Sequence, residues 1–158
     1  MQPTRTIRRA HPEDVDCITA LVNEAYHHYV PRMGKKPAPM REDYRQVLAS
    51  AQVYVLTVDE DIAGVLVLSQ EAGELLLENI AVLPRYKGQG IGKTLLLFCE
   101  DHARRARCTA IRLYTHERMT ENIDLYKKLG YLETHRATEN GFARVFMRKS
   151  LGSGLAVQ

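Results

Sequence analysis

The chain has 158 residues, of which 45% are hydrophobic and 26% are charged. This length is near the usual size of one domain, and the apolar content is that of a packed core rather than of a disordered chain. The 22 basic and 19 acidic residues give a net charge of only +3, whereas a nucleic-acid-binding protein usually has a larger excess of basic residues. No apolar run approaches the ~20 residues of a membrane helix, and the N-terminus lacks the apolar segment of a signal peptide. We therefore expect a cytoplasmic protein with no membrane or nucleic-acid partner, with one domain over residues 1–150 and a flexible tail over 151–158.

The cysteines and histidines do not indicate a metal site or a disulfide framework. Three cysteines, Cys17, Cys99 and Cys108, are an odd number and match no paired metal motif, which favours ordinary thiols in a reducing compartment. The histidines show neither the HExxH spacing nor a Cys/His zinc spacing. No metal is predicted.

The first third of the chain is predicted to be mainly helical. A short strand over residues 4–9 precedes a helix whose apolar residues recur at helical spacing from Val15 to about Tyr29. Residues 31–39 contain three prolines and a glycine, so we expect this stretch to be irregular. A short helix is expected over residues 42–49.

The rest of the chain is rich in predicted strands. Two strands over residues 52–58 and 62–69 flank an acidic turn and predict a hairpin, and a third strand over 74–83 ends at Pro84. Three consecutive strands before the next helix predict an α/β fold of the mixed α+β type, not a uniformly parallel sheet. The later elements are a long amphipathic helix from Ile91, a strand over 109–115, a helix over 121–129, and strands over 131–136 and 143–148.

The most informative segment is the loop between the third strand and the long helix, where three glycines alternate with other residues. Such a loop turns successive backbone N–H groups toward one point, and the helix N-terminus adds unpaired donors and partial positive charge. The predicted ligand is a phosphate or pyrophosphate, and a plain glycine-rich turn is the structural alternative. The glycines are Gly88, Gly90 and Gly92, and the cations around them are Arg85, Lys87 and Lys93.

Two nucleotide-binding patterns fit this loop only in part. The dinucleotide pattern G-x-G-x-x-G takes Gly88 and Gly90 but needs glycine or alanine where Lys93 stands, and the next strand lacks its acidic residue. The P-loop pattern G-x-x-x-x-G-K-[ST] matches residues 92–94, yet its first glycine falls on Lys87. A P-loop-like nucleotide-binding protein stays open as a third hypothesis.

Two blocks together resemble the GNAT-type N-acetyltransferases. Residues 79–92, NIAVLPRYKGQGIG, are similar to that family's acetyl-CoA pyrophosphate motif R/Q-x-x-G-x-G/A, with Lys87 where Arg or Gln is usual. Residues 122–131, NIDLYKKLGY, are similar to the family's downstream N…LY…LGF/Y segment and lie at the expected distance. The resemblance covers about residues 50–149. It implies a GNAT-like single domain with a splayed central sheet flanked by helices, and acetyl-CoA as the acetyl donor.

The resemblance also implies roles in direct acetyl transfer to an amine. Glu78, just before the stretch that splays in similar proteins, is the predicted general base, directly or through water. Glu74, two pleats earlier on the same strand face, is the alternative. Backbone N–H groups around Ala81 and Val82 would polarise the thioester carbonyl, and Tyr126 would protonate the leaving thiolate. The predicted donor-binding residues are Ile80, Ala81, Val82, Lys87, Gly88, Gln89, Gly90, Ile91, Gly92, Lys93 and Asn122.

The sequence does not identify the acceptor. Similar proteins build the acceptor pocket partly from the loop between the first two helices, which here carries Arg32, Lys35, Lys36 and Arg41. This loop either suits an amine that also bears a carboxylate or phosphate, or is a solvated basic loop. A small-molecule amine and a peptide amine both stay open, and a homodimer is common among similar proteins. The main alternative to an enzyme is a non-catalytic acyl-CoA-binding or sensor module on the same fold.

Overall fold

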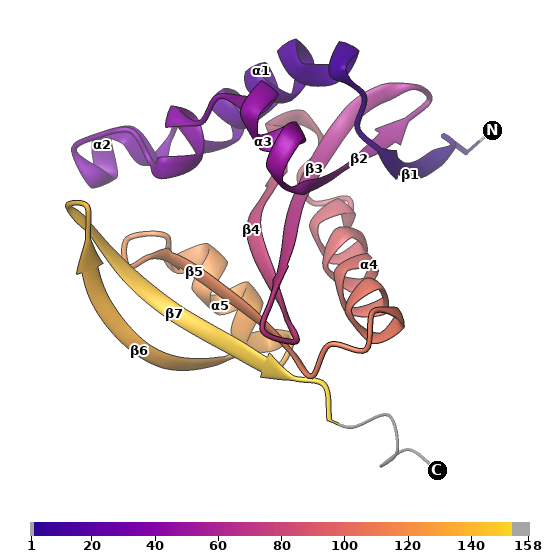
Figure 1. Cartoon of the computed structure of the whole chain (residues 1–158). Coiled ribbons are helices and arrows are strands. Elements are labelled where there is room, and N and C mark those ends of the chain that lie inside the picture. Colours follow the sequence, from indigo (N-terminus) through magenta and orange to yellow (C-terminus); the bar gives the residue numbers. More distant parts are fainter. Residues whose placement is uncertain (1, 153–158) are drawn as a thin grey trace. The chain divides into compact units, whose positions relative to one another are not determined.

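The computed structural model describes residues 2–152 and contains a seven-stranded mixed sheet with the order β1-β2-β3-β4-β5-β7-β6 (Figure 1). β4 and β5 pair in parallel, whereas β1–β2, β2–β3, β5–β7 and β6–β7 pair antiparallel. The predicted mixed sheet is therefore confirmed. The strands are β1 (Arg5–Arg9), β2 (Gln52–Val58), β3 (Asp61–Glu71), β4 (Glu74–Val82), β5 (Ala110–His116), β6 (Leu132–Glu139) and β7 (Phe142–Ser150).

The helices lie close to their predicted positions, with one exception. The stretch expected to be irregular begins inside a helix, because Pro31 is the third residue of α2. N–H groups in the first turn have no acceptor within the helix, so a proline there removes no hydrogen bond. Gly34, with a φ of 77°, ends this helix. The α-helices are α1 (Val15–Tyr26), α2 (Tyr29–Met33), α3 (Tyr44–Ser50), α4 (Ile91–Arg105) and α5 (Thr120–Lys128), and the 3-10 turns are η1 (Pro12–Asp14), η2 (Ala38–Arg41) and η3 (Pro84–Tyr86).

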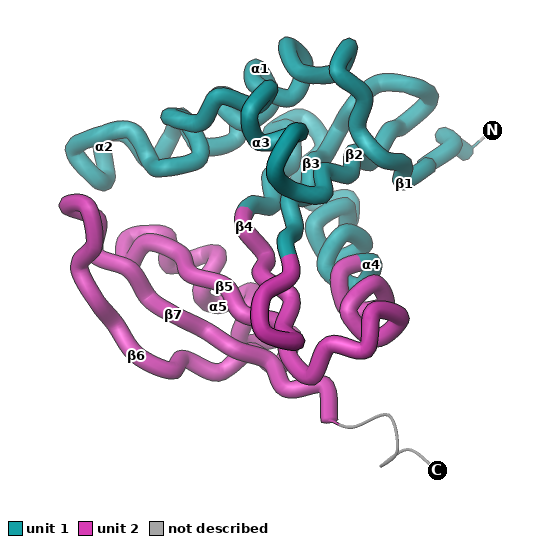
Figure 2. Tube along the Cα trace, in the orientation of Figure 1, with its two compact units in different colours: residues 1–69, 79–98 teal, residues 70–78, 99–158 magenta. Residues whose placement is uncertain are grey.

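The chain folds as two compact units (Figure 2). Of the described residues, 2–69 and 79–98 form unit 1, and 70–78 and 99–152 form unit 2. Three elements, β3, β4 and α4, pass from one unit into the other. The predicted domain boundary at residue 150 stays a prediction, and the predicted tail lies outside the described residues from 153 onward.

Unit 1 is built on the β2–β3 hairpin. Asp59 and Glu60, in the predicted acidic turn, have φ values of 49° and 79°, which is the left-handed pair that a tight two-residue hairpin turn requires. Helix α1 covers the core with apolar residues at helical spacing, and it packs against α3 and η2. The largest fully buried aliphatic side chains of this unit are Ile18, Leu21, Leu56, Leu66, Leu68, Ile91, Leu95 and Leu96.

A glycine in β3 determines how closely α4 approaches the sheet. A Cβ atom at Gly64 would lie 3.0 Å from Leu95 Cδ1 and 3.1 Å from Ile91 Cγ2, both on the first two turns of α4. It would also lie 3.4 Å from the carbonyl oxygen of Ala81 on β4. A side chain there would push the helix outward, so Gly64 holds the start of α4 beside the end of β4.

Unit 2 contains β5, β7 and β6 together with α5. Within this unit, β4 pairs with β5 from Leu75↔Ile111 to Leu77↔Leu113, and both strands continue beyond these residues. The predicted splay of β4 from β5 past that point depends on the placement of the two units and stays a prediction. No helix within residues 2–152 is long and apolar enough to cross a membrane.

Candidate active site

The glycine loop of unit 1 contains two residues in the left-handed region of backbone conformation. Gly88 and Gly90 have φ values of 80° and 79°, which residues with a side chain rarely adopt. Apart from the adjoining residues of the chain, no atom lies within 4 Å of where a Cβ would stand at either glycine, so the loop surface is open. The Arg5 side chain on β1 donates to the Gln89 carbonyl at 2.8 Å and holds the loop from outside the motif.

This loop presents a row of backbone donors. Within the described residues, the N–H groups of residues 88–93 donate to no protein acceptor. They belong to the loop and to the first turn of α4, where a helix leaves its N–H groups unpaired and partially positive. The side chain of Ile91 is buried and anchors the helix start, while Lys87 and Lys93 are exposed beside it. The loop therefore fits a phosphate or pyrophosphate group.

The threonine that completes the partial P-loop match is already engaged. Thr94 Oγ1 donates to the Gly90 carbonyl at 2.9 Å, inside its own helix turn. In a P-loop this hydroxyl binds the magnesium ion that accompanies the nucleotide. The bond within the helix disfavours the P-loop hypothesis.

The end of β4 lies directly beside this loop. A Cβ at Gly92 would stand 3.9 Å from Val82 Cγ2, so the structure brings the predicted strand residues and the predicted loop residues together. The Leu83 N–H donates to the Ala63 carbonyl on β3 at 2.9 Å. Backbone groups alternate between the two edges of a strand, so those of Ala81 face β3 and those of Ile80 and Val82 face the opposite edge. This alternation favours the N–H of Val82 over that of Ala81 for the predicted contact with the thioester.

A buried hydrogen-bond network that connects α1, β4, α3 and η2 was not predicted from the sequence. Tyr26 on α1 donates from its hydroxyl to Asn79 Oδ1 at 2.7 Å and to the Ile80 carbonyl at 3.0 Å. Asn79 Nδ2 donates to the Tyr44 hydroxyl at 3.1 Å, and that hydroxyl donates to the Pro39 carbonyl at 2.7 Å. Burial raises the pKa of Tyr44, which stays a neutral donor. One signal was present in the sequence: a strand asparagine among apolar residues needs a buried partner.

The two candidate base residues on β4 have different surroundings in unit 2. Glu74 is half-buried and accepts from Arg148 Nη2 at 2.7 Å, with Arg112 Nε 3.1 Å away. Its hydrogen bond with Arg148 lowers the pKa of Glu74, and Arg112 adds to the effect. Glu78, two pleats along the same face, is exposed. These surroundings favour Glu78 as the base and give Glu74 a structural role.

The two predicted residues of α5 also lie in unit 2. Tyr126 is buried, and its ring meets that of Tyr131 edge-on with the centroids 5.6 Å apart. Asn122 is half-buried in the first turn of α5, and its Nδ2 lies 3.7 Å from Met119 Sδ. Lys149 donates to the Leu129 carbonyl at 2.7 Å, which closes the C-terminal end of this helix.

The three cysteines have different surroundings, and none of them lies in the glycine loop, at the end of β4 or on α5. Cys17 is exposed on α1, whereas Cys99 and Cys108 are buried. Burial raises the pKa of Cys99 to about 12, so this thiol stays protonated near neutral pH. No group of three or more His, Cys, Asp or Glu side chains in residues 2–152 is arranged to hold a metal ion.

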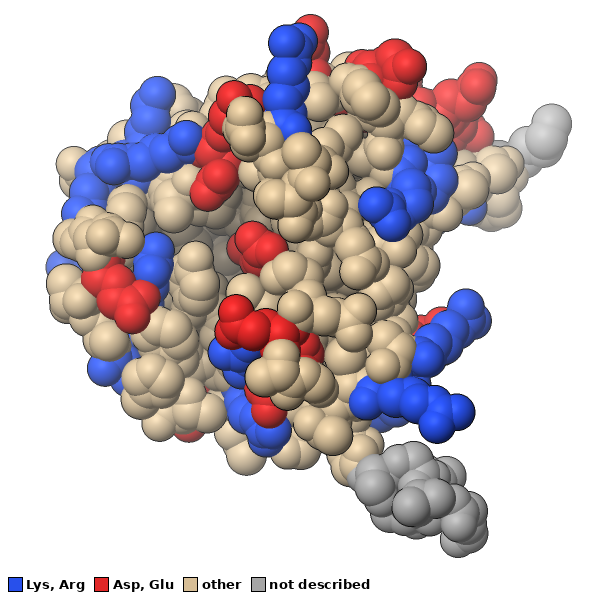
Figure 3. Space-filling view, viewed as in Figure 1, with Lys and Arg blue, Asp and Glu red and all other residues tan. Residues whose placement is uncertain are grey.

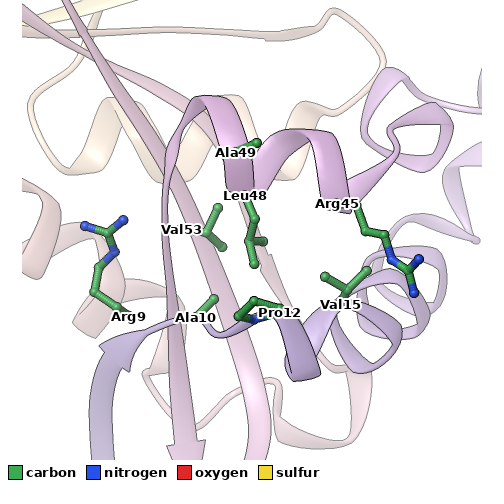
Figure 4. Close-up of a pocket in the computed structure, with 8 residues that line it drawn as sticks. All are labelled: Arg9, Ala10, Pro12, Val15, Arg45, Leu48, Ala49 and Val53. Atoms are coloured by element: carbon green, nitrogen blue, oxygen red, sulfur yellow. The ribbon is translucent and has the colours of Figure 1, made fainter.

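A cavity of about 460 Å³ in unit 1 is lined by none of the predicted site residues (Figure 4). Its walls are mainly apolar, and Arg9 and Arg45 stand on its two sides with their guanidinium groups directed away from it. Since neither arginine side chain points inward, this cavity lacks the convergent polar side chains of a specific ligand site.

The charges on the surface are mixed. On the face drawn in Figure 3, Lys and Arg side chains form several separate groups, and acidic side chains lie among them. A nucleic-acid-binding surface more often carries one continuous basic stripe.

Comparisons with known proteins decide the family. A sequence profile described as "Acetyltransferase (GNAT) family" matches residues 18–131. The chain belongs to the GNAT acetyltransferase family. The GNAT match includes residues of both units, so the two units are parts of one family domain.

Three known proteins are similar to this GNAT chain. The "Probable N-acetyltransferase 14" of Xenopus tropicalis is 32% identical over 90 residues, which are 55% of this chain and 44% of that protein. The ribosomal-protein-S18-alanine N-acetyltransferase of Escherichia coli is 20% identical, with a TM-score of 0.77 and 96% of each chain covered. The PaiA N-acetyltransferase of Thermoplasma acidophilum, solved with coenzyme A, is 20% identical, with a TM-score of 0.77, covering 93% of this chain and 99% of that one. At this level of identity the two solved structures confirm the GNAT fold.

Proposed function

We propose that this protein transfers the acetyl group of acetyl-CoA directly to a primary amine of a small molecule or a peptide. The observation that carries the proposal is the row of N–H groups at residues 88–93, which have no acceptor within the described residues, at the end of β4. The coenzyme A bound in a relative of the same fold supports the choice of donor. Acetyl-CoA supplies the activated acetyl group as a thioester.

In this proposal the loop residues bind the pyrophosphate of the donor. The main-chain N–H groups of Gly88 to Lys93 hydrogen-bond the phosphate oxygens, and Lys87 and Lys93 supply positive charge. These contacts use the backbone, so they tolerate the replacement of the family's Arg or Gln by Lys87. Asn122 on α5 completes the set of donor-binding residues.

The amine presents a protonation problem that Glu78 would solve. A lysine-like amine with a pKa near 10.4 is neutral in only about one of 2,500 molecules at pH 7. Glu78 takes the proton from the amine, directly or through water, as the nitrogen bonds to the carbonyl carbon. The N–H of Val82 hydrogen-bonds the carbonyl oxygen, where negative charge develops.

Tyr126 would complete the reaction at the leaving group. When the carbon–sulfur bond breaks, the Tyr126 hydroxyl gives its proton to the thiolate, whose conjugate thiol has a solution pKa near 8.5. Proton exchange with solvent then restores both groups. The protein's thiols take no part, so we propose direct transfer without an acetylated cysteine. We also propose a cytoplasmic enzyme that forms a homodimer.

The test separates the enzyme from a sensor. Calorimetry with acetyl-CoA measures donor binding, and a thiol-release assay over a panel of amines then measures turnover. We expect Glu78→Gln to bind acetyl-CoA normally and to lower kcat/KM about 100-fold, the scale of a lost general base. Glu74→Gln, on the same strand face, is the matched control and should keep most of the activity.

Two other outcomes would contradict parts of the proposed function. Tight acetyl-CoA binding with no turnover on any amine would support the acyl-CoA sensor in place of the enzyme. Equal activity of Glu78→Gln and the wild type would remove the base assignment while leaving acetyl transfer intact.

A further inference from the structure

The number of hydroxyl protons determines which group donates and which accepts in each hydrogen bond of the buried network in unit 1. A tyrosine hydroxyl has one proton to donate, and that of Tyr44 goes to the Pro39 carbonyl at 2.7 Å. The Tyr44 oxygen must then accept from Asn79, which places Nδ2 toward Tyr44 and Oδ1 toward Tyr26. The single proton of Tyr26 is therefore shared between two acceptors, Asn79 Oδ1 and the Ile80 carbonyl.

The carbonyl of Ile80 lies on the functionally important edge of β4. Backbone groups of Ile80 and Val82 share the edge that faces away from β3, because Leu83 bonds to Ala63 on the other edge. Two residues along a strand span about 7 Å. The Ile80 carbonyl and the Val82 N–H lie within one such repeat, so the Tyr26 hydroxyl contacts the backbone less than 7 Å before the N–H of Val82, on the same edge.

The bond from Tyr26 also sets the orientation of the chain between these points. The peptide unit that carries the Ile80 carbonyl is planar and continues into the N–H of Ala81. With its carbonyl held by Tyr26 on one edge, and its N–H turned toward β3 on the other, this peptide plane cannot rotate freely. The next peptide plane carries the N–H of Val82.

We infer that Tyr26 is a positioning residue for acetyl transfer: its hydroxyl holds the Ile80 carbonyl and thereby aims the Val82 N–H at the thioester carbonyl. Asn79 accepts a second share of the Tyr26 proton, and Tyr44 connects Asn79 to η2 without contacting Tyr26 in this network. The inference rests on the proposed function, since it requires that the Val82 N–H on this edge of β4 binds the thioester carbonyl. All of the network belongs to unit 1, so its geometry does not depend on unit 2.

The natural test is Tyr26→Phe, which removes the hydroxyl and keeps the buried ring. Acetyl-CoA labelled with ¹³C at the acetyl carbonyl is bound to each protein, and infrared difference spectra report how strongly that carbonyl is polarised. We expect the bound carbonyl to absorb at lower frequency than the free one in the wild type, and to lose most of this shift in Tyr26→Phe. By calorimetry, CoA should bind as before, and the preference for acetyl-CoA over CoA should fall about fivefold, the scale of one neutral hydrogen bond.

The control variant is Tyr44→Phe. It removes a hydroxyl at the far end of the same network but leaves the bond from Tyr26 to the Ile80 carbonyl in place. It should keep most of the infrared shift. Hydrogen exchange of the backbone amides checks that both variants are folded.

Each result has a definite meaning. A full carbonyl shift in Tyr26→Phe would overturn the inference and leave the proposed function standing. Loss of the shift in both variants would assign the effect to general loosening of unit 1 and would likewise overturn it. If acetyl-CoA does not bind the wild-type protein, or binds with an unshifted carbonyl, the proposed function itself fails.

Discussion

At the scale of single residues, the phenol of Tyr126 gives the most direct test of the leaving-group step. The ring is buried against Tyr131, so Tyr126→Phe keeps the packing and removes only the hydroxyl. We expect turnover to fall at least tenfold, because the thiolate then leaves without a proton from the protein. The affinity for acetyl-CoA, measured by calorimetry, should change little. Unchanged turnover would show that water or another group is the acid.

Glu74 provides a prediction about pH. Its hydrogen bond with Arg148 lowers the pKa of this carboxyl below the ordinary 4.5, so the folded state binds the proton more weakly than the unfolded state. The resulting stability is fully present above about pH 4.5 and is lost as the pH falls through the lower, folded-state pKa. Urea unfolding should therefore show Glu74→Gln to be less stable than the wild type at pH 7, with a smaller difference at pH 3. A difference that does not depend on pH would contradict the ion-pair account.

At the scale of elements, Lys149 stabilises the helix that carries Tyr126. Its Nζ donates to the Leu129 carbonyl at 2.7 Å and lies 3.0 Å from Glu100 Oε2, and both side chains are largely shielded from solvent. Lys149→Met keeps the aliphatic stem and removes both contacts. We expect a loss of about 2 kcal/mol in the free energy of unfolding, the scale of a charged hydrogen bond. Faster amide exchange in α5 would locate the effect.

The matched control for Lys149 is an exposed pair in the same unit. Arg136 and Glu133 on β6 form an ion pair of 2.8 Å at the surface. Arg136→Gln should leave the unfolding curve unchanged within error, because solvent screens such pairs. If Lys149→Met and Arg136→Gln lower the free energy of unfolding equally, the shielding of Lys149 from solvent does not strengthen its contacts.

Helices and strands could be predicted from the sequence where residues close together in the chain determine where they begin and end. The acidic turn at Asp59 and Glu60 indicated the hairpin, and the alternating glycines placed the start of α4. The prediction failed at Pro31, because a proline-rich composition does not show which proline falls in the first turn of a helix. The network of Tyr26 was also hidden, since its partner Asn79 is 53 residues away and only the packing of α1 on β4 brings them together.

At the scale of the whole molecule, the continuity of β3, β4 and α4 through both units predicts cooperative unfolding. Each of these elements is a single hydrogen-bonded segment, so melting it in one unit removes its support in the other. We expect one thermal transition, and the same opening free energy by hydrogen exchange at Leu66 in unit 1 and Val145 in unit 2. Two separate transitions would show that the units are independently stable.

Donor binding should stabilise the same cooperative unit. A ligand at 100 times its Kd that binds only the native state adds about 2.7 kcal/mol. For a chain of this size, this stabilisation raises the Tm by about 5–10 °C. Acetyl-CoA and CoA should both produce this shift, because the loop at residues 88–93 binds the pyrophosphate that they share. ATP with magnesium should produce a smaller shift than CoA, since the Thr94 hydroxyl that a P-loop would offer to the metal is bonded to Gly90. A rise in Tm with ATP and magnesium but not with CoA would reverse this assignment and support a nucleotide-binding loop.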